Sequence, residues 1–429
     1  MNEKVLTFGC RLNIYESELI RKHLSSLKAG DDVLVMNSCA VTAEAERQLR
    51  QAIRKAHKEN PDLKIVVTGC AAQLDPLKYA AMPGVLRVIG NQEKLSVESY
   101  KNLSSDGNDT IAQAQKISVN DIMSVSDTAL HLIDGFENNV RGFLQIQNGC
   151  NHRCTFCIIP YARGNSRSVP VTDIIDQAKI LVDRGYNEIV LTGVDITDYG
   201  NDLPEKLSLG VAVKSLLDGV PNLQRLRLSS IDVAEVDEEL IKLFASDSRM
   251  MPNIHLSLQS GDDMVLKRMK RRHLREDIKN FYYKIKELRP EITFGADIIA
   301  GFPTESDLMF QNTYDLLSEL DIIFMHVFPY SERQNTPASR MPQVAKEVRR
   351  ERAKALRSLC NTKVLNHYKN SVRKRAKVLI EKNGAGRAED FSQVRIAGAE
   401  SKNRDLIGKV LQISLTELSS DGVLLGNIV

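Results

Sequence analysis

The sequence lacks any run of 18 consecutive apolar residues, the length that a membrane-spanning helix needs. Residues 1–9 lack the pattern of a secretory signal peptide. Net charge is only +3, from 58 basic and 55 acidic residues, so overall charge indicates no particular partner. These absences predict a cytoplasmic protein without a membrane segment. In that reducing compartment we expect the seven cysteines to bind metal or act in catalysis rather than to form disulfides.

Composition and length predict a soluble protein of two or three domains. Hydrophobic residues make up 42% of the 429-residue chain and charged residues 26%. We expect an N-terminal domain over residues 1–95, a linker over 96–139, a central domain over 140–340, a connecting helix over 341–370 and a small β domain over 371–429. The linker is rich in Ser, Asp and Asn, and we expect one strand in it to pair back.

Three short apolar runs in the N-terminal domain each end at a cysteine: Cys10, Cys39 and Cys70. The cysteines lie about thirty residues apart, which is the length of a strand–helix–strand unit. Between the second and third runs, Thr42 can cap a helix that has acidic residues in its first turn. Parallel strands would therefore deliver three thiols to the carboxyl edge of one sheet, where α/β sheets bind ligands.

The central domain alternates six apolar runs with helical patterns, which predicts a parallel α/β sheet that is open or curled into a partial barrel. The predicted strands cover residues 142–147, 188–192, 224–229, 254–258, 293–298 and 323–328. Hydrophobic spacing then predicts a long helix over residues 343–370. Strands are expected after it at 376–380, 393–397, 409–416 and 423–429.

A second set of three cysteines lies in Cys150-Asn-His-Arg-Cys154-Thr-Phe-Cys157, directly after the first central strand. Three thiolates on one tight loop can hold three irons of a [4Fe–4S] cluster and leave the fourth iron open to a small molecule. A zinc site is an alternative, but it would need a fourth ligand, and His152 is too close in sequence for easy tetrahedral closure. An inert group of buried thiols is the other alternative.

This motif resembles that of the radical S-adenosylmethionine (SAM) superfamily. The resemblance implies that the amino and carboxylate groups of SAM bind the open iron, and that the reduced cluster cleaves SAM to a 5′-deoxyadenosyl radical. It also implies SAM contacts at an aromatic residue before the last cysteine and at the ends of later strands. The matching positions are Phe156, Gly193, Asp195, Ser229, Gln259 and Gly301. Plain turn positions are the alternative for the two glycines.

With both cysteine sets, nearly the whole chain resembles the methylthiotransferase family. The sequence motifs that resemble those of the family are Thr7-Phe-Gly-Cys-Arg-Leu-Asn13, Asn37-Ser-Cys39, Val67-Thr-Gly-Cys70, Gly149-Cys-Asn151, Ile158-Ile-Pro-Tyr-Ala-Arg163, Ser257-Leu-Gln-Ser-Gly261, Gly301-Phe-Pro-Thr-Glu305 and His326-Val-Phe-Pro-Tyr-Ser331. The resemblance implies a mixed α/β fold: a small parallel α/β domain, a partial (β/α)6 radical SAM barrel and a small C-terminal β-barrel like the RNA-binding TRAM domain. It also implies a second [4Fe–4S] cluster on Cys10, Cys39 and Cys70 that carries the sulfur to be inserted. A reductant such as flavodoxin or ferredoxin follows from this chemistry, and we expect a monomer.

Local charge favours an RNA substrate over the ribosomal protein aspartate that one branch of the family modifies. Residues 340–377 contain 13 Lys and Arg against two acids, a local charge of +11, and residues 267–275 form a second basic stretch. A solvated helix face is the alternative, but a run of one sign suits phosphate better. The residues predicted to contact RNA, the anticodon stem-loop of tRNA, are Arg349, Arg350, Arg373, Lys374, Arg375 and Lys377.

Two branches of the family that modify tRNA remain as alternatives. Cys10-Arg-Leu-Asn13 with Tyr15-Glu16, and the Pro160-Tyr-Ala-Arg-Gly164 segment, resemble the branch that modifies N6-threonylcarbamoyladenosine 37 at C2 more than the branch that acts on N6-isopentenyladenosine 37. A non-catalytic iron–sulfur RNA-binding protein also stays open. An electron carrier would need two clusters with four ligands each, which two sets of three cysteines do not supply. The seventh cysteine, Cys360, is expected to be a small buried residue on the long helix.

Overall fold

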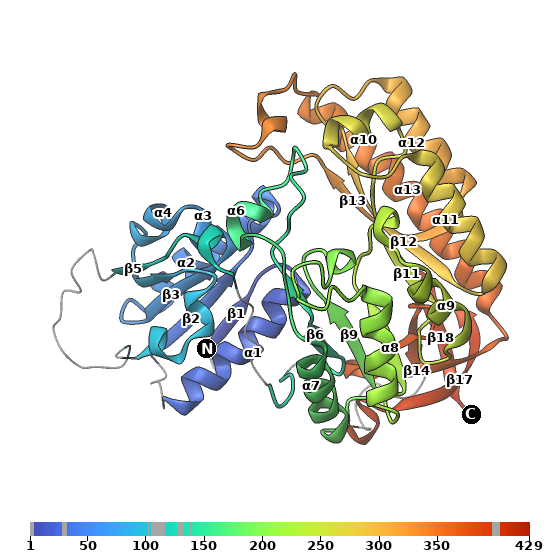
Figure 1. Ribbon diagram of the computed structural model, residues 1–429, viewed down its shortest axis with the longest axis horizontal. Coiled ribbons are helices and arrows are strands. Elements are labelled where there is room, and N and C mark those ends of the chain that lie inside the picture. Colours follow the sequence, from blue (N-terminus) through green and yellow to red (C-terminus); the bar gives the residue numbers. More distant parts are fainter. Residues whose placement is uncertain are drawn as a thin grey trace.

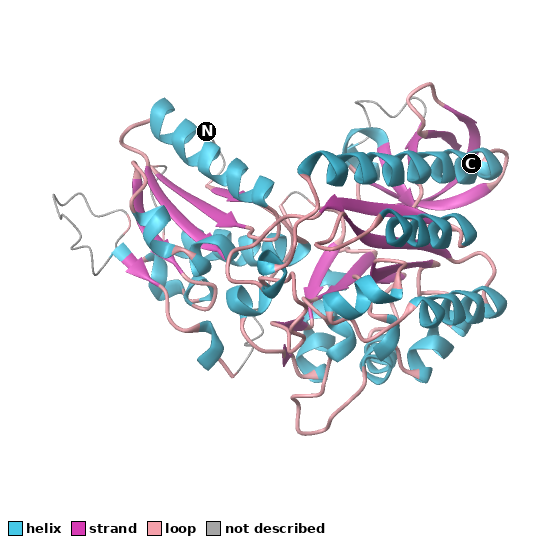
Figure 2. Cartoon of the chain, turned by 90° about the horizontal axis from the view of Figure 1, so that it is seen from above, coloured by secondary structure: helices cyan, strands magenta, loops and turns pink. Residues whose placement is uncertain are grey.

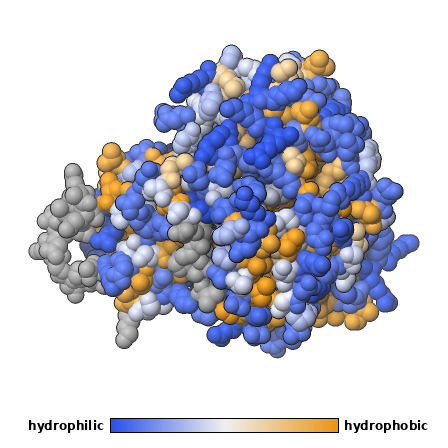
Figure 3. Space-filling model, viewed as in Figure 1, coloured by the Kyte–Doolittle hydropathy of each residue, from blue (hydrophilic) through white to orange (hydrophobic). Residues whose placement is uncertain are grey.

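The computed structural model describes residues 4–27, 32–101, 103, 116–126, 133–137, 139–396 and 404–429. An N-terminal α/β part, a larger central part and a C-terminal barrel follow one another along the chain (Figure 1). No helix in these described ranges has both the length and the apolar character needed to cross a bilayer. Hydrophilic side chains cover most of the face drawn in Figure 3.

The N-terminal part is a parallel sheet of five strands in the order β1-β2-β3-β4-β5. The strands are β1 (Val5–Thr7), β2 (Val33–Ser38), β3 (Lys64–Gly69), β4 (Val85–Ile89) and β5 (Ile117–Ser118). The helices are α1 (Arg11–Ser26), α2 (Ala43–Glu59), α3 (Cys70–Leu74) and α4 (Pro76–Ala80). Every residue of β2 is buried, as its continuous apolar run predicts, and Thr42 caps α2 by accepting from the Ala45 N–H.

Strand β5 belongs to the stretch expected to be a linker, and it pairs with β4 as one strand there was expected to do. Two 3-10 turns, at Val97–Tyr100 and Ile122–Ser124, are also described in this stretch. Much of residues 96–139 lies outside the described residues, as does Ala397 at the end of one predicted strand.

The central part contains six parallel strands in two sheets of three, β10-β9-β6 and β11-β12-β13. Single bridges, Leu226 to Met250 and Ile231 to Leu256, join β10 to the second sheet, so the strands form a partial barrel. The strands are β6 (Gly142–Gln145), β9 (Glu188–Thr192), β10 (Arg225–Leu228), β11 (Asn253–Gln259), β12 (Thr293–Ala300) and β13 (Ile322–Pro329). The helices are α6 (Ile159–Arg163), α7 (Val171–Asp183), α8 (Leu209–Gly219), α9 (Glu238–Ser246), α10 (Asp263–Met269), α11 (Arg275–Leu288) and α12 (Asp307–Glu319).

The first central strand is shorter than predicted. The chain leaves the sheet after Gln145, and a hairpin of β7 (Gln147–Asn148) and β8 (Arg167–Ser168) brackets the loop with the second cysteine set. The cysteine loop therefore begins from this hairpin rather than directly from the barrel strand.

The C-terminal part consists of the long helix α13 (Lys346–Ser371) and a closed barrel of five strands in the order β14-β15-β16-β18-β17 (Figures 1 and 2). The strands are β14 (Arg375–Ile380), β15 (Ala385–Ala388), β16 (Gln393–Ile396), β17 (Val410–Leu418) and β18 (Leu424–Ile428). Arg227 donates to the carbonyls of Ala388 and Glu389, and Thr293 donates to that of Asp390. These contacts place the small barrel against the starts of the central strands, opposite the edge that binds ligands in such folds.

Helix α1 belongs to two cores. Leu24 packs into the core beneath the N-terminal sheet, whereas Tyr15 and Leu19 join the large central core with Leu144 and Ile189. Because apolar burial is shared, α1 attaches the N-terminal sheet to the central barrel.

Candidate active site

The first cysteine set lies together at the carboxyl edge of the N-terminal sheet, as predicted. Cys10 is the N-cap of α1, Cys39 follows β2 and Cys70 opens α3 directly after β3. A Cβ on Gly9, whose φ is +101°, would lie 2.8 Å from the Cys39 Sγ, so only glycine lets the chain pass this thiol. Burial raises the pKa of Cys39 to about 12, and the nearby thiols of Cys70 and Cys10 add to the rise. Three converging thiols are a donor set that fits an iron–sulfur cluster.

The second cysteine set also converges. Gly149, with φ +71°, lies against the Asn165 carbonyl, where any side chain would collide. Burial raises the pKa of Cys157 to about 12 and raises that of Cys150 as well. Burial alone would also raise the pKa of Cys154, but hydrogen bonds from His152 and Arg271 outweigh it and lower this pKa. Arg271 lies 3.6 Å from the Cys154 Sγ. This loop therefore fits a second iron–sulfur cluster.

A buried polar network joins the two cysteine sets. The guanidinium of Arg163, which ends α6 after the second cysteine loop, donates to Glu16 Oε1 at 2.9 Å and to Asn13 Oδ1 at 2.7 Å. Lys94 donates to Glu16 at 2.6 Å and to Asn91 at 2.7 Å. The Asn91 amide in turn reaches the Cys70 Sγ at 3.7 Å and the Ala162 carbonyl at 2.6 Å. No local pattern in the sequence signals this network, because its members lie far apart along the chain.

The predicted SAM residues gather at the strand ends next to the second cysteine loop. Gly193 and Asp195 follow β9, and the Asp195 carboxylate lies 3.6 Å from the Cys150 Sγ. Ser229 follows β10, and its buried Oγ has no hydrogen-bond partner among the described residues. Gln259 ends β11 with φ +66°. An orphaned buried hydroxyl beside converging strand ends fits a polar ligand such as SAM.

Two further predicted SAM positions have structural contacts. Phe156 packs edge-on against Phe302, with ring centroids 6.3 Å apart. Gly301 has φ +72°, and its missing side chain leaves room for the Cγ of Arg349, which a Cβ there would meet at 2.6 Å. Both residues therefore make contacts within the protein, and their contact with SAM stays a prediction.

Beside the second cysteine loop, the sequence reasoning missed Glu235, Asp232 and the inward orientation of Arg271. His152 lies 3.2 Å from both Asp195 and Glu235, and its pKa rises to about 10 through hydrogen bonds to Cys154 and then Glu235. Arg271 pairs with Asp232 at 2.7 Å. The one available signal was the basic stretch 267–275, which we interpreted as a phosphate contact. The structure corrects that interpretation for Arg271, because its guanidinium is turned inward onto Asp232 and Cys154.

The residues predicted to contact RNA divide into two groups. Arg350, Arg373, Lys374, Arg375 and Lys377 are exposed. Arg349 is only 7% exposed, and its guanidinium donates to the carbonyls of Val344 and Tyr330 and to Gln343. Because its donors are taken inside the protein, the prediction that Arg349 contacts phosphate is wrong.

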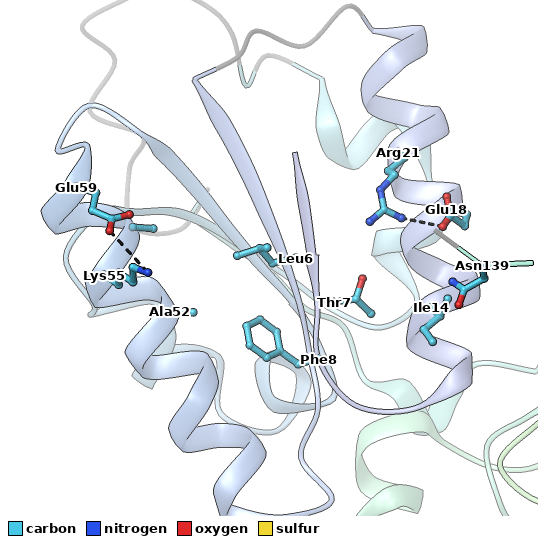
Figure 4. Close-up of a pocket in the computed structure, with 11 residues that line it drawn as sticks. Leu6, Thr7, Phe8, Ile14, Glu18, Arg21, Ala52, Lys55, Glu59 and Asn139 are labelled. Carbon is cyan, nitrogen blue, oxygen red and sulfur yellow. Dashed lines mark hydrogen bonds and ion pairs between the residues drawn. The ribbon is translucent and has the colours of Figure 1, made fainter. Parts of the chain in front are cut away.

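A cavity lies away from both cysteine sets, at the β1 edge of the N-terminal sheet. Its volume is ≈ 540 Å³, and Figure 4 shows it between Ile14, Glu18 and Arg21 of α1 and Ala52, Lys55 and Glu59 of α2. None of the cysteines or predicted SAM residues lines it.

Comparison with known protein families agrees with the radical SAM resemblance of the second cysteine site. Residues 144–317 match the radical SAM superfamily, and residues 3–90 match uncharacterized protein family UPF0004. The superfamily implies a [4Fe–4S] cluster and SAM, and the matched residues include the second cysteine set. The solved structure of the radical S-adenosylmethionine methyltransferase TsrM from Kitasatospora setae shares the fold, with a TM-score of 0.55 and 17% identity over 77% of this chain and 67% of that chain.

Relatives extend the similarity to nearly the full length. A tRNA-2-methylthio-N(6)-dimethylallyladenosine synthase from Clostridium tetani (strain Massachusetts / E88) is 30% identical over 96% of this chain and 93% of its own length. The threonylcarbamoyladenosine tRNA methylthiotransferase MtaB of Rickettsia prowazekii (strain Madrid E) is 52% identical over 92% of this chain and 91% of its own. These similarities confirm the resemblance inferred from the motifs, and the chain belongs to the radical SAM tRNA methylthiotransferase family, in its threonylcarbamoyladenosine branch.

Proposed function

We propose that this protein is a cytoplasmic tRNA methylthiotransferase that adds a methylthio group at C2 of N6-threonylcarbamoyladenosine 37. The observation that carries the proposal is the convergence of two separate thiol triplets, held on one buried network, in a chain 52% identical to a protein named for this activity. When bound, two [4Fe–4S] clusters and SAM would supply the sulfur, the methyl group and the radical that activates the C2–H bond.

The protein's own residues would hold the two clusters and SAM in position. Cys150, Cys154 and Cys157 would ligate the SAM-binding cluster, and Arg271 stabilises the Cys154 thiolate. Cys10, Cys39 and Cys70 would ligate the auxiliary cluster at the sheet edge that faces the barrel. Because α1 is packed into the central core, the two sets keep a fixed relation during the reaction.

The domain assignment follows the same division. Residues 1–95 carry the auxiliary set, 140–340 form the radical SAM barrel, 341–370 form the connecting helix and 371–429 form the TRAM-like barrel, with 96–139 as a linker. Five of the residues predicted to contact RNA are exposed and support binding of the anticodon stem-loop by phosphate contacts: Arg350, Arg373, Lys374, Arg375 and Lys377. We further propose that the protein acts as a monomer and receives electrons from a flavodoxin or ferredoxin.

The test is a single-turnover assay with reconstituted protein, SAM, a reductant and anticodon stem-loop RNA that carries threonylcarbamoyladenosine. Mass spectrometry of the digested RNA should show the mass of one added methylthio group. Isopentenyladenosine RNA is the competing substrate, because the relative from Clostridium tetani is named for a dimethylallyl base. Product from that RNA alone would move the protein to the second branch. RNA binding without product from either RNA, in protein that cleaves SAM, would reject both.

A further inference from the structure

Two imidazoles and a carboxylate from neighbouring strands meet at one point of the second sheet. His255 Nε2 of β11 and His326 Nδ1 of β13 both lie 3.1 Å from Oδ1 of Asp297 on β12. Parallel pairing places Asp297 directly opposite His326. The ligand atoms of the three side chains all lie within 4.8 Å of one another. Three strands therefore bring two nitrogen donors and one oxygen donor into one small volume.

This cluster faces the interior of the partial barrel. Alternation along β11 buries Leu256 and leaves His255 and Gln259 on the less buried side of the sheet. The opposite side belongs to the large central core, which contains Leu256 together with Leu316 of α12. The His326 side chain is 59% exposed. A small ion can therefore reach the three donors from solvent without opening the hydrophobic core.

Neighbouring residues orient the members of the cluster. The second carboxylate oxygen of Asp297 accepts from Ser230 Oγ at 3.4 Å, which leaves Oδ1 toward the two imidazoles. A Cβ on Gly295 would lie 2.5 Å from Nδ1 of His255, so the missing side chain makes room for this ring. The two imidazole rings are tilted by 37°, with their centroids 4.8 Å apart. Contacts of this kind from residues behind the ligands fix ligand orientation in metal sites.

The donor types and their spacing suit a transition metal. Two ligands about 2.0–2.1 Å from one zinc ion stand about 3.0–3.4 Å apart, and each imidazole nitrogen is 3.1 Å from the Asp297 oxygen. Imidazole nitrogens suit zinc and its neighbours in the first transition row, whereas magnesium and calcium prefer oxygen ligands. Three protein ligands also leave a fourth position open, as in catalytic rather than structural zinc sites.

We propose that His255, Asp297 and His326 bind one divalent transition-metal ion of the zinc class. The open coordination position faces the barrel interior and takes water or another oxygen ligand. This site is separate from both cysteine sets, because none of its three ligands is a cysteine or one of the predicted SAM residues. It goes beyond the proposed function, which requires only the two clusters and SAM.

The experiment measures zinc binding by reconstituted protein that carries its iron–sulfur clusters. Equilibrium dialysis against a series of zinc concentrations, with metal analysis, should show about one zinc per chain and unchanged iron. X-ray absorption at the zinc edge should show nitrogen and oxygen ligands at about 2.0–2.2 Å and no sulfur at about 2.3 Å. His326→Ala, at an exposed position, should weaken zinc binding by at least about 100-fold, because changes behind the ligands alone cost about 10- to 100-fold. Asp297→Asn should also weaken it.

The matched control is His367→Ala. His367 Nε2 lies 2.9 Å from Asp390, a His–Asp pair that has no second imidazole, so zinc binding should not change in this variant. Sulfur ligands in the zinc spectrum, or zinc uptake that displaces iron, would place the zinc in a cysteine set and overturn the proposal. Absence of zinc binding in wild type, or unchanged binding in both His326→Ala and Asp297→Asn, would overturn it as well.

Discussion

The buried network between the two cysteine sets gives the sharpest stability prediction. Arg163, Glu16 and Lys94 are 2%, 1% and 0% exposed, so each charge depends on the others rather than on water. Arg163→Met removes the cation that bridges α6 and α1. Glu16 then retains only Lys94 as a cationic partner, and the Asn13 side chain loses a 2.7 Å hydrogen bond. Removing one member of a buried ion pair costs about 3–5 kcal/mol.

The pKa of Glu16 gives an independent magnitude. Burial alone would raise it, but Arg163 and Lys94 hold it at about 2, against an ordinary value of 4.5. This difference corresponds to roughly 3 kcal/mol of stability at neutral pH. Because the folded pKa is depressed, that stability is fully present above pH 4.5 and is lost as pH falls toward 2. This magnitude reflects Arg163 and Lys94 together against the opposing effect of burial, and it is of the same order as the loss expected for the Arg163 variant.

Native-state hydrogen exchange of the α1 amides measures this loss locally, which suits a chain of several domains. Arg163→Met should lower the free energy of opening of α1 by about 3 kcal/mol. The control is Arg47→Met, which breaks an exposed bidentate pair with Glu44 in α2 and should have little effect, because water screens this pair. Equal losses in the two variants would refute the reasoning. Replacing Glu16, Lys94 and Arg163 together by Leu, Met and Met should restore much of the loss, because no unpaired charge remains buried.

Three further predictions concern the cofactors and the RNA. Reconstituted protein should bind about eight irons per chain, and the Cys150, Cys154 and Cys157 triple alanine variant should bind about four and lose SAM cleavage; saturation of wild type at four would reject the two-cluster proposal. The Cys10, Cys39 and Cys70 triple alanine variant should still cleave SAM but form no methylthio product, and normal product formation would show that the sulfur comes from elsewhere. Changing Arg373, Lys374 and Arg375 to Gln should weaken all tRNAs about equally and reduce the slope of log affinity against log salt by roughly two to three units, as filter binding over a salt series measures. An unchanged slope would mean that this surface does not meet phosphate.

Much of the fold could be predicted because its strands are short, apolar and followed by chemically distinctive residues. The predicted strands 188–192 and 254–258 correspond to β9 and to the middle of β11. The three N-terminal runs end at cysteines that parallel pairing brings to one edge. Periodicity placed the long helix within a few residues of α13. Cys360 on that helix is half-buried against the central core, close to the expectation of a small buried residue.

Side-chain direction could not be predicted from charge patterns. Arg349 and Arg350 are neighbours in one basic run, yet the first is buried under Tyr330 and the second is exposed. Helical geometry separates adjacent residues onto different faces, and a count of charges ignores this. Likewise, Glu16 lies 78 residues from Lys94 and 147 from Arg163 along the chain. Only tertiary packing reveals that these three charges meet.

The start of α1 is a short segment that takes part in both cysteine sites. Cys10 caps the helix without a side-chain hydrogen bond to its backbone, so its sulfur stays available as a ligand. The side chains of Asn13 and Glu16, farther along the helix, then point toward Arg163. A helix repeats every 3.6 residues, so four consecutive positions cover its whole circumference. Different faces of the start of α1 can therefore offer a cluster ligand and contact α6, which follows the second cysteine loop.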